Sequence, residues 1–283
     1  MKKLFSVALL TLLLTSVLAL ALDIQPVKSD WTWTETIYIK ADGSIDPPDS
    51  PITTVDNVTY TLTGNIVVDG PQYRGIVVQR DNIIIDGAGY TVETREFERE
   101  FGITLEGSNV TLKNVEVKNF AGGIYISGSS NNVQRCNITN NYRGIEISSS
   151  SNNSISENNI IGQVYQVCLY GSSNNSIVGN NIIDGRGADI YLHMSSNNSI
   201  QKNNIAGDSQ HFINLSNSSG NVIYHNNFIT ACEGIYSYES TNIWDNGYPS
   251  GGNYWGDYAG ADLYRGPEQN EHGSDDIVDT PYV

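Results

Sequence analysis

Residues 123–211 read GIYISGSSNNVQRCNITNNYR (123–143), GIEISSSSNNSISENNIIGQVYQ (144–166), VCLYGSSNNSIVGNNIIDGRGA (167–188) and DIYLHMSSNNSIQKNNIAGDSQH (189–211). The four segments share one pattern, and related segments begin at residues 102, 212 and 234. The repeat length is therefore 21 to 23 residues. A short, fixed period is typical of a solenoid, in which each repeat forms one coil and buries its apolar side chains by stacking on its neighbours.

Each repeat is too short for a pair of helices and indicates short strands joined by Ser, Asn and Gly turns. Apolar residues alternate near the start of the repeats: Ile124 and Ile126, Ile145 and Ile147, Ile190 and Leu192, Ile213 and Leu215. The position between them varies: Tyr125, Glu146, Leu169, Tyr191, Asn214 and Tyr236. A period of two predicts strands with one face inward and one face outward. Ile124, Ile145, Ile190, Ile213 and Ile235 then form one inward column, which Cys168 joins.

Two columns of asparagine support this alignment. The first comprises Asn109, Asn132, Asn153, Asn175, Asn198 and Asn221. The second comprises Asn114, Asn137, Asn159, Asn181, Asn204 and Asn227. Stacked side-chain amides can bond to one another and to turn backbone, and Asn tolerates the left-handed conformation of sharp turns. A disordered Ser/Asn-rich tract has no reason to keep isoleucines in phase with them.

The composition excludes some classes of partner. The 283 residues carry a net charge of −16, which argues against nucleic acid, since binding to it needs a basic surface. An acidic surface fits divalent cations or solubility outside the cell. The three cysteines, Cys136, Cys168 and Cys232, are an odd number and predict buried or inert thiols in place of a disulfide framework. We expect a monomer.

The flanking segments predict how the solenoid begins and ends. Residues 1–21 have two lysines, a Leu-rich run and an Ala-Leu-Ala cleavage site, which indicate a signal peptide and an extracellular, cell-surface or periplasmic location. A retained membrane anchor is the alternative. We assign residues 22–61 to an N-terminal cap, 62–247 to the solenoid and 248–283 to a cap rich in Gly, aromatic and acidic residues. The charged run 93–100, ETREFERE, is expected to be a loop that leaves the coil.

The chain resembles the NosD-like family. DNIIIDGAGYTV (81–92) followed by GITLEGSNVTLKNVEVKNF (102–120) is similar to its opening coils, and GGNYWGDYAGAD (251–262) with GSDDIVDTPY (273–282) is similar to the tail of many archaeal surface proteins of this group. The resemblance implies an all-β fold, a right-handed parallel β-helix. It also implies a link to periplasmic assembly of a copper site, and more distantly to polysaccharide-active β-helices. Relatives have D-G-I-G-D where this chain has DDIVD (275–279).

Copper binding has little support in the sequence. Copper prefers soft or imidazole ligands, and this chain has four His and two Met. Among these only His193 and Met194 are adjacent, and neighbours in a strand point to opposite faces.

A polysaccharide enzyme is an open alternative. A lyase needs a basic residue and a cation that offsets the uronate charge, whereas a hydrolase needs convergent carboxylates. The turns between coils supply a candidate set: Asp184, Arg186, Asp208 and His211. Because stacked coils are about 4.8 Å apart, these four residues could lie close together. Charged turn residues are, however, often only solvated.

Carbohydrate binding makes fewer demands and is the function we favour over catalysis. The outward column supplies the candidate contacts Tyr125, Glu146, Tyr191 and Tyr236. Tyrosine combines a flat apolar ring with a polar tip, which suits sugar rings, although tyrosine also favours exposed strands in general. The sequence thus predicts a module that binds an extended polysaccharide or surface glycan, and a plain structural surface protein is the remaining alternative.

Two further sites are predicted. The SSNNS repeats contain the sequons of Asn152, Asn174 and Asn197, the most credible N-glycosylation sites. The tail contains five acids within a short distance: Asp257, Asp262, Asp275, Asp276 and Asp279. Carboxylates mixed with backbone carbonyls are ligands that Ca²⁺ prefers, so this tail is a candidate calcium site, with a solvated acidic tail as the alternative.

Overall fold

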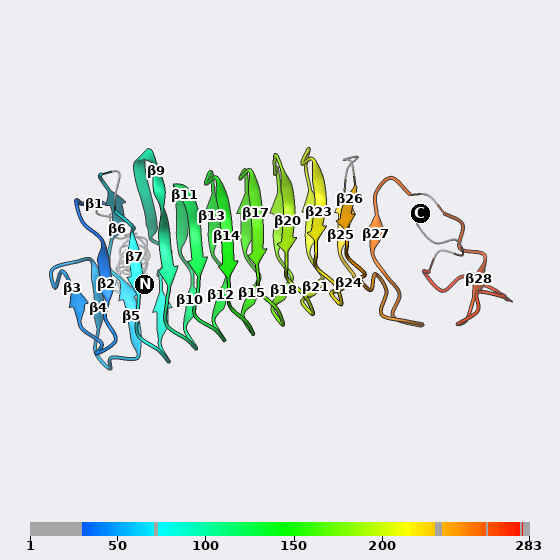
Figure 1. Ribbon diagram of the computed structural model, residues 1–283, viewed down its shortest axis with the longest axis horizontal. Helices are drawn as coiled ribbons and strands as arrows, with labels where there is room; N and C mark the ends of the chain where they lie inside the picture. Colours follow the sequence, from blue (N-terminus) through cyan, green and yellow to red (C-terminus); the bar gives the residue numbers. More distant parts are fainter. Residues whose placement is uncertain (1–29, 71–72, 230–233, 259, 278, 280–283) are drawn as a thin grey trace, which may run out of the picture.

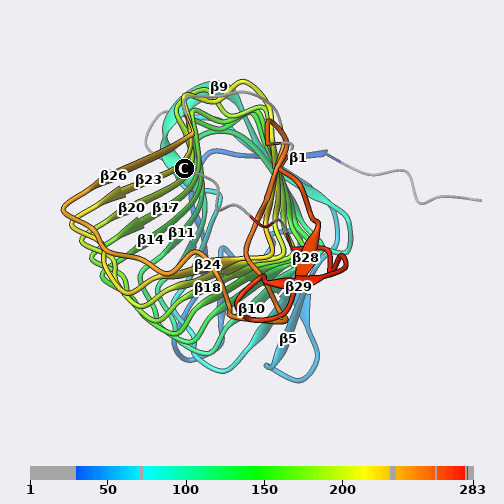
Figure 2. The ribbon, with the colours of Figure 1, turned by 90° about the vertical axis from the view of Figure 1, so that its right-hand side faces the viewer.

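The computed structural model describes residues 30–70, 73–229, 234–258, 260–277 and 279. Within these ranges every named element is a strand, and the strands stack as successive coils of an elongated solenoid (Figure 1). A view turned by 90° shows the coils superimposed around one common interior (Figure 2). The described part of the chain holds no helix of the length and hydropathy needed to cross a membrane. The predicted signal segment and Cys232 lie outside the described residues.

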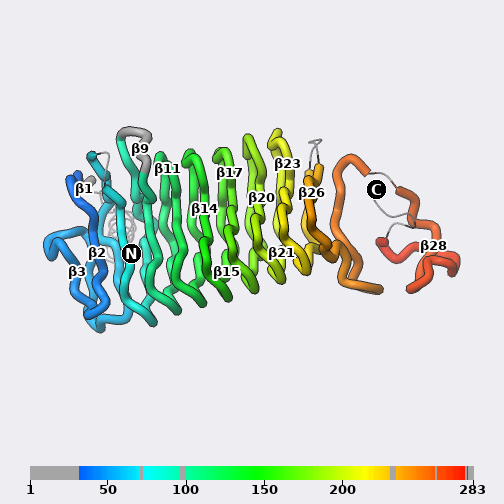
Figure 3. The backbone as a smooth tube through the Cα atoms, viewed as in Figure 1, coloured from blue at the N-terminus to red at the C-terminus, as the bar shows by residue number. Residues whose placement is uncertain are grey.

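Three rows of parallel strands form the walls, and the backbone trace in Figure 3 shows the coils that carry them side by side along the long axis. The first row consists of the ends of β9 (Thr91–Leu105) and β11 (Glu116–Ile126), then β14 (Arg143–Ser148), β17 (Tyr165–Tyr170), β20 (Ala188–His193), β23 (His211–Ser216) and β26 (Ile235–Tyr238). The second row consists of β8 (Ile84–Asp86), β10 (Thr111–Lys113), β12 (Asn132–Gln134), β15 (Ser154–Ser156), β18 (Ser176–Val178), β21 (Ser199–Gln201) and β24 (Val222–Tyr224). The third row consists of β13 (Asn137–Thr139), β16 (Asn159–Ile161), β19 (Asn181–Ile183), β22 (Asn204–Ala206), β25 (Asn227–Ile229) and β27 (Tyr254–Trp255).

The inward column of the first row is confirmed. Ile124 pairs with Ile145, and the column continues through Val167, Ile190 and Ile213. All five side chains are fully buried. Full burial of a side chain of this size contributes roughly 1.5–3 kcal/mol, so one column supplies a large share of the stability.

The predicted alignment is wrong by one residue in one coil. Cys168 pairs with Glu146 and Tyr191, so it belongs to the outward column, and Leu169 pairs with Ile147 and points inward. The error arises because the alignment starts this repeat at Val167, whereas Val167 pairs with Ile145, the second residue of the preceding repeat. Cys168 is buried all the same, because side chains of the outer face cover it.

The asparagine ladders exist, but with partly different members. Two ladders are buried, and in each the side-chain oxygen of one asparagine accepts a hydrogen bond from the backbone N–H of the asparagine in the preceding coil. The first ladder consists of Asn131, Asn153, Asn175, Asn198 and Asn221, and the second of Asn158, Asn180, Asn203 and Asn226. A third, half-buried ladder joins Asn137, Asn159, Asn181 and Asn204 on the outer surface.

Three predicted members of these columns lie elsewhere. Asn109 bonds to Asn82 and Asn114 bonds to Asp86, both at positive φ, while Asn132 is outward in β12, beside the ladder residue Asn131. The adjacent asparagines in each repeat look alike in sequence. The pleat alone decides which of the two points inward.

The charged run 93–100 is not a loop that leaves the coil. It lies within the 15-residue strand β9, in which Glu93 and Glu98 of the run pair with Lys118 and Phe120 of β11. Register shifts around Phe120 allow the two long strands to turn the corner from the third row to the first. β-bulges of this kind bend a strand without ending its pairing.

The two ends differ from the regular coils. At the N-terminal end, β1 (Asp30–Trp33), β2 (Ile37–Ile39), β6 (Asn65–Val68) and β7 (Ile76–Val78) pair in parallel with the first coils. β3 (Ile45–Asp46) and β4 (Ile52–Thr54) add antiparallel pairs to β2 and to β5 (Thr59–Leu62). At the C-terminal end Trp255 stacks on Phe228 at 4.5 Å between ring centroids, before β28 (Tyr264–Arg265) and β29 (Glu271–His272).

Candidate functional site

The outer face of the first row carries a groove that crosses five successive coils, from β14 to β26. Its volume is about 500 Å³. We call it the tyrosine groove, and its lining consists of Tyr142, Arg143, Tyr165, Tyr170, Gly187, Ala188, Tyr191, Gln210, His211, Asn214 and Tyr236. Five of these eleven residues are tyrosines: one precedes β14, two lie at the ends of β17, and β20 and β26 contribute one each.

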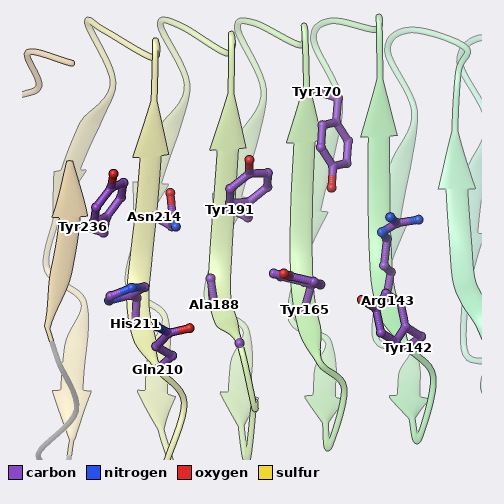
Figure 4. A pocket seen from close by; sticks show the side chains of 11 residues that line it. Tyr142, Arg143, Tyr165, Tyr170, Ala188, Tyr191, Gln210, His211, Asn214 and Tyr236 are labelled. Atoms are coloured by element: carbon purple, nitrogen blue, oxygen red, sulfur yellow. The ribbon is translucent and has the colours of Figure 1, made fainter. Parts of the chain in front are cut away.

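The groove is hollow because one coil has small residues where its neighbours have large ones. Ala188 pairs with His211, and in Figure 4 it lies between Tyr165 and His211. Gly187 precedes it, so the floor of the groove at β20 is almost bare backbone. Parallel pairing keeps equivalent positions side by side, so one small residue among large ones leaves a hollow.

Aromatic rings contact one another along both edges of the groove. Tyr165 lies 6.0 Å from Tyr142 and 6.0 Å from Tyr191, measured between ring centroids. On the β23 side, His211 and Tyr236 are 5.6 Å apart. All these pairs are tilted or edge-to-face, the geometry that aromatic rings prefer. The contacts hold the rings in place before any ligand binds.

The β14 end of the groove contains the charged side chains. Arg143 Nη1 lies 3.4 Å from Glu146 Oε2, and the guanidinium lies 5.7 Å from the ring centroid of Tyr142. The Glu146 side chain is only 12% exposed, and its burial raises the pKa of the carboxyl, an effect that Arg143 opposes. Burial also raises the pKa of Cys168 to about 12, so this thiol is protonated and unreactive at neutral pH.

A buried carboxyl lies behind the floor of the groove. Asp189 follows Ala188, is fully buried and accepts a hydrogen bond from Ser209 Oγ through Oδ2. Its Oδ1 has no hydrogen-bond partner, and neither does Oε1 of Gln166 on the adjacent coil. Burial raises the pKa of Asp189 to about 7, and the charge of Asp184 acts in the same direction. A protonated Asp189 can donate to an amide oxygen, which a carboxylate cannot.

The structure places only part of the predicted carbohydrate contacts together. Tyr191 and Tyr236 line the groove. Tyr125 lies outside the lining and packs on Phe101 at 4.8 Å, and Glu146 lies largely beneath Arg143. The sequence alignment missed Tyr142, Tyr165 and Tyr170, because it started the repeats at 144 and 167 and so assigned the first two to turns. Their common feature, an aromatic residue just before or just after the alternating strand, could have identified them.

The four catalytic candidates are divided between the groove and the turns. His211 lines the groove, whereas Asp184, Arg186 and Asp208 are exposed in the turns between the third and first rows. The groove lining includes no carboxylate. A pair of convergent carboxylates, which a hydrolase needs, is therefore not part of this lining.

The tail acids bond mainly to backbone. Asp279 accepts from the N–H groups of Leu263 and Tyr264, and Asp262 accepts from those of Asp275 and Asp276. The described residues contain no group of three or more His, Cys, Asp or Glu that could hold a metal ion. The five tail acids do not fit a preformed calcium site, so calcium binding stays a prediction.

The predicted glycosylation sites share one turn of the coil. Asn152, Asn174 and Asn197 are exposed, and each has a φ between 57° and 59°. Their exposure is compatible with modification. Of the histidines, His193 stacks on Tyr191 and His225 bonds to the Ser250 carbonyl, so these two are not brought together as copper ligands.

Comparisons with known proteins concern the fold. A family model described as a right-handed β-helix region matches residues 101–247, which confirms the predicted hand of the coil. The enzymatically active domain of tailspike protein 2 of bacteriophage CBA120 is 13% identical, with a TM-score of 0.50 over 80% of this chain and 41% of that chain. No curated protein matches the sequence.

Two other solved structures are similar at lower scores. A pectate lyase is 14% identical over 84% of this chain and 72% of that chain, with a TM-score of 0.48. A double mutant of a periplasmic alginate epimerase is 16% identical over 64% of this chain and 51% of that chain, with a TM-score of 0.47. The chain thus spans about half of the epimerase and less than half of the tailspike domain.

Proposed function

The chain belongs to the right-handed β-helix family, and from this premise we propose that it binds an extended carbohydrate in the tyrosine groove. The observation that carries the proposal is the clustering of five tyrosines with Gln210, His211 and Asn214 around one hollow. Aromatic faces cover the apolar faces of sugar rings, and amide and imidazole groups bond to hydroxyls. A concave site with a few convergent polar groups is the common form of a ligand site.

The geometry also supports a pre-organised site. The edge rings contact one another, and Tyr191 and His193 stack with an interplanar angle of 3°. Side chains that are already held lose little conformational entropy on binding, so more of the contact energy appears as affinity. The proposal places the working face of the protein outside the cytoplasm, in accord with the expected signal segment.

Glycan-array binding of the full chain tests the proposal with two kinds of variant. Tyr165→Ala with Tyr191→Ala removes two faces, and we expect about a tenfold loss of affinity, since each aromatic contact contributes about 0.5–1.5 kcal/mol. Ala188→Phe fills the floor with a ring that matches its neighbours Tyr165 and His211, and should block binding while the fold remains. Tyr248→Ala is the control, because Tyr248 is exposed on the C-terminal tail. Wild-type protein that retains no glycan, or a filled groove that still binds, contradicts the proposal.

A lyase is the second candidate, and one observation favours it. His211 lines the groove as a candidate base, and Arg143, three coils away in the strand register, is a candidate cation for an acidic group of the same ligand. Release of unsaturated oligosaccharide by the protein, and loss of that release in His211→Gln with binding retained, would identify an enzyme. Binding without product would identify a binding module.

A further inference from the structure

We propose that the tyrosine groove binds an anionic oligosaccharide lengthwise, along the solenoid axis, with an acidic group of the ligand held by Arg143 at the β14 end. The inference rests on the proposed function and adds to it the direction, the length and the charge of the ligand. Three independent features of the groove carry it: the run of lining residues across coils, the absence of acids from the lining, and the incomplete pairing of Arg143.

The direction follows from the origin of the lining residues. They come from β14, β17, β20, β23 and β26 and the turns before them, so the long axis of the groove crosses the strands (Figure 4). Adjacent strands are about 4.8 Å apart, so five coils span roughly 19 Å between the first and the last strand. An oligosaccharide that lay along a single strand would extend beyond the groove after a few sugars.

The length follows from the repeat of the rings. Successive rings on the β14 side are 6.0 Å apart, from Tyr142 to Tyr165 and from Tyr165 to Tyr191. A pyranose ring is close in size to the ring of tyrosine, so each coil can accommodate one sugar. Affinity should therefore increase with ligand length until about five sugars fill the five coils, and change little beyond that length.

The charge preference follows from what the lining excludes. The chain has 31 acidic residues and a net charge of −16, yet the eleven lining residues include no Asp or Glu. Arg143 and His211 are the basic side chains among them. At physiological salt the field of an exposed charge is screened over about 8 Å, so distant acids act weakly here while Arg143 acts at contact. The lining of the groove therefore lacks the acidic side chains that give the whole protein its negative charge.

Arg143 has capacity for a second carboxylate. Its ion pair with Glu146 uses Nη1 at 3.4 Å, Nε is buried without a hydrogen bond, and the side chain as a whole is 38% exposed. A guanidinium has five N–H donors, and a ligand carboxylate or sulfate can accept from the exposed donors that Glu146 does not use. Glu146 is only 12% exposed, and its burial raises the pKa of its carboxyl, an effect that Arg143 opposes. The ring of Tyr142 keeps the guanidinium in position.

Calorimetric titration of the full chain tests all three parts. The probes are oligogalacturonates and oligomannuronates of two to seven residues, the same oligomers with carboxyl groups reduced to alcohols, and a sulfated oligosaccharide of equal length. We expect affinity to level off near five residues. We also expect the reduced oligomers to bind about tenfold more weakly, because a charge-assisted hydrogen bond contributes about 1.5–3 kcal/mol.

Variants assign the charge preference to one residue. Arg143→Gln should bind acidic and reduced oligomers alike, Arg143→Lys should keep part of the preference, and Arg186→Gln, which changes an exposed arginine outside the lining, should behave as wild type. If only the carboxylated oligomers bind more tightly than the reduced ones, the ligand is a uronate. If the sulfated oligosaccharide binds equally tightly, the groove is a general anion site. An acid preference that survives Arg143→Gln, or equal binding of both oligomer forms by the wild type, overturns this inference alone. A protein that binds no glycan in the array contradicts the proposed function itself.

Discussion

The turn between the first and second rows and the outer face of the first row belong to the same coils, yet they differ in almost every respect. The turn repeats Ser-Asn-Asn with little change, and its buried asparagines bond coil to coil at 2.8–2.9 Å. The outer face changes at each coil, from Glu146 to Cys168 to Tyr191 to Asn214. Positions that repeat stabilise the stack, and positions that depart from the repeat form the groove.

The largest expected effect concerns neighbouring isoleucines in β19. Ile182 is fully buried and Ile183 points outward, half-buried. Ile182→Ala should lower the free energy of unfolding by about 2–5 kcal/mol, because it leaves a cavity in the column. Ile183→Ala, with the same atoms removed, should cost much less. Chemical denaturation measures both, and equal losses would mean that the inward face has been misassigned.

The second prediction concerns the pH dependence of stability, which the buried carboxyl of Asp189 should contribute. In the unfolded chain Asp189 titrates near 3.8, and in the fold near 7. Below pH 4 both states hold the proton and the fold has its full stability. As the pH rises from 4 to 7 the unfolded state releases the proton first, so the free energy of unfolding falls by up to about 1.4 kcal/mol per unit. Above pH 7 this contribution is lost and changes no further.

Denaturation at a series of pH values measures this slope. Asp189→Asn should remove the part that Asp189 contributes, because an amide keeps the acceptor for Ser209 and does not titrate. Asp208→Asn, an exposed acid on the same side of the stack, is the matched control and should leave the slope as it is. A slope that is the same in wild type and Asp189→Asn would show that Asp189 is ionised in the fold.

The smallest effect compares three asparagines of one coil. The amide of buried Asn180 bonds to two backbone groups of the preceding coil, the N–H of Asn158 and the carbonyl of Ile155. Asn181 belongs to the half-buried outer ladder, and Asn174 is exposed at positive φ. Asn180→Ala should cost about 1–3 kcal/mol, since it leaves backbone groups unpaired. Asn181→Ala should cost less, and Asn174→Ala least. A melting-temperature series in any other order would break the assignment of the ladders.

The fold could be predicted from the sequence because the period and the alternation are local signals that recur in every coil. Ile124, Ile145 and Ile213 reveal the inward face without any knowledge of the rest of the chain. The site could be predicted only in part, because it depends on which outward residues become neighbours. Because the alignment starts one repeat a single residue late, at Val167, it assigns Cys168 to the inward column in place of the outward one and misplaces Tyr165 and Tyr170.

The charged run 93–100 shows the same limit in another way. Its charges suggest a loop, yet it is strand, and Glu93 and Glu98 pair with β11, because backbone pairing does not depend on the charge of the side chains. Strand preference depends on context more than helix preference does. The outcome could not be read from the eight residues themselves.

The stacked pair of Trp255 and Phe228 has a consequence for the size of the particle. A stack of identical coils has no intrinsic end. Its last coil presents the same apolar cross-section and the same backbone groups with which every earlier coil pairs to the next one. A second molecule could pair with this exposed coil, and repeated end-to-end pairing would form a fibre. The indole of Trp255 stacks on the buried ring of Phe228, and β27, which carries it, is the last strand of the third row and has only two residues. In this way a chain built on indefinite repetition acquires an end at the apolar cross-section of its last coil.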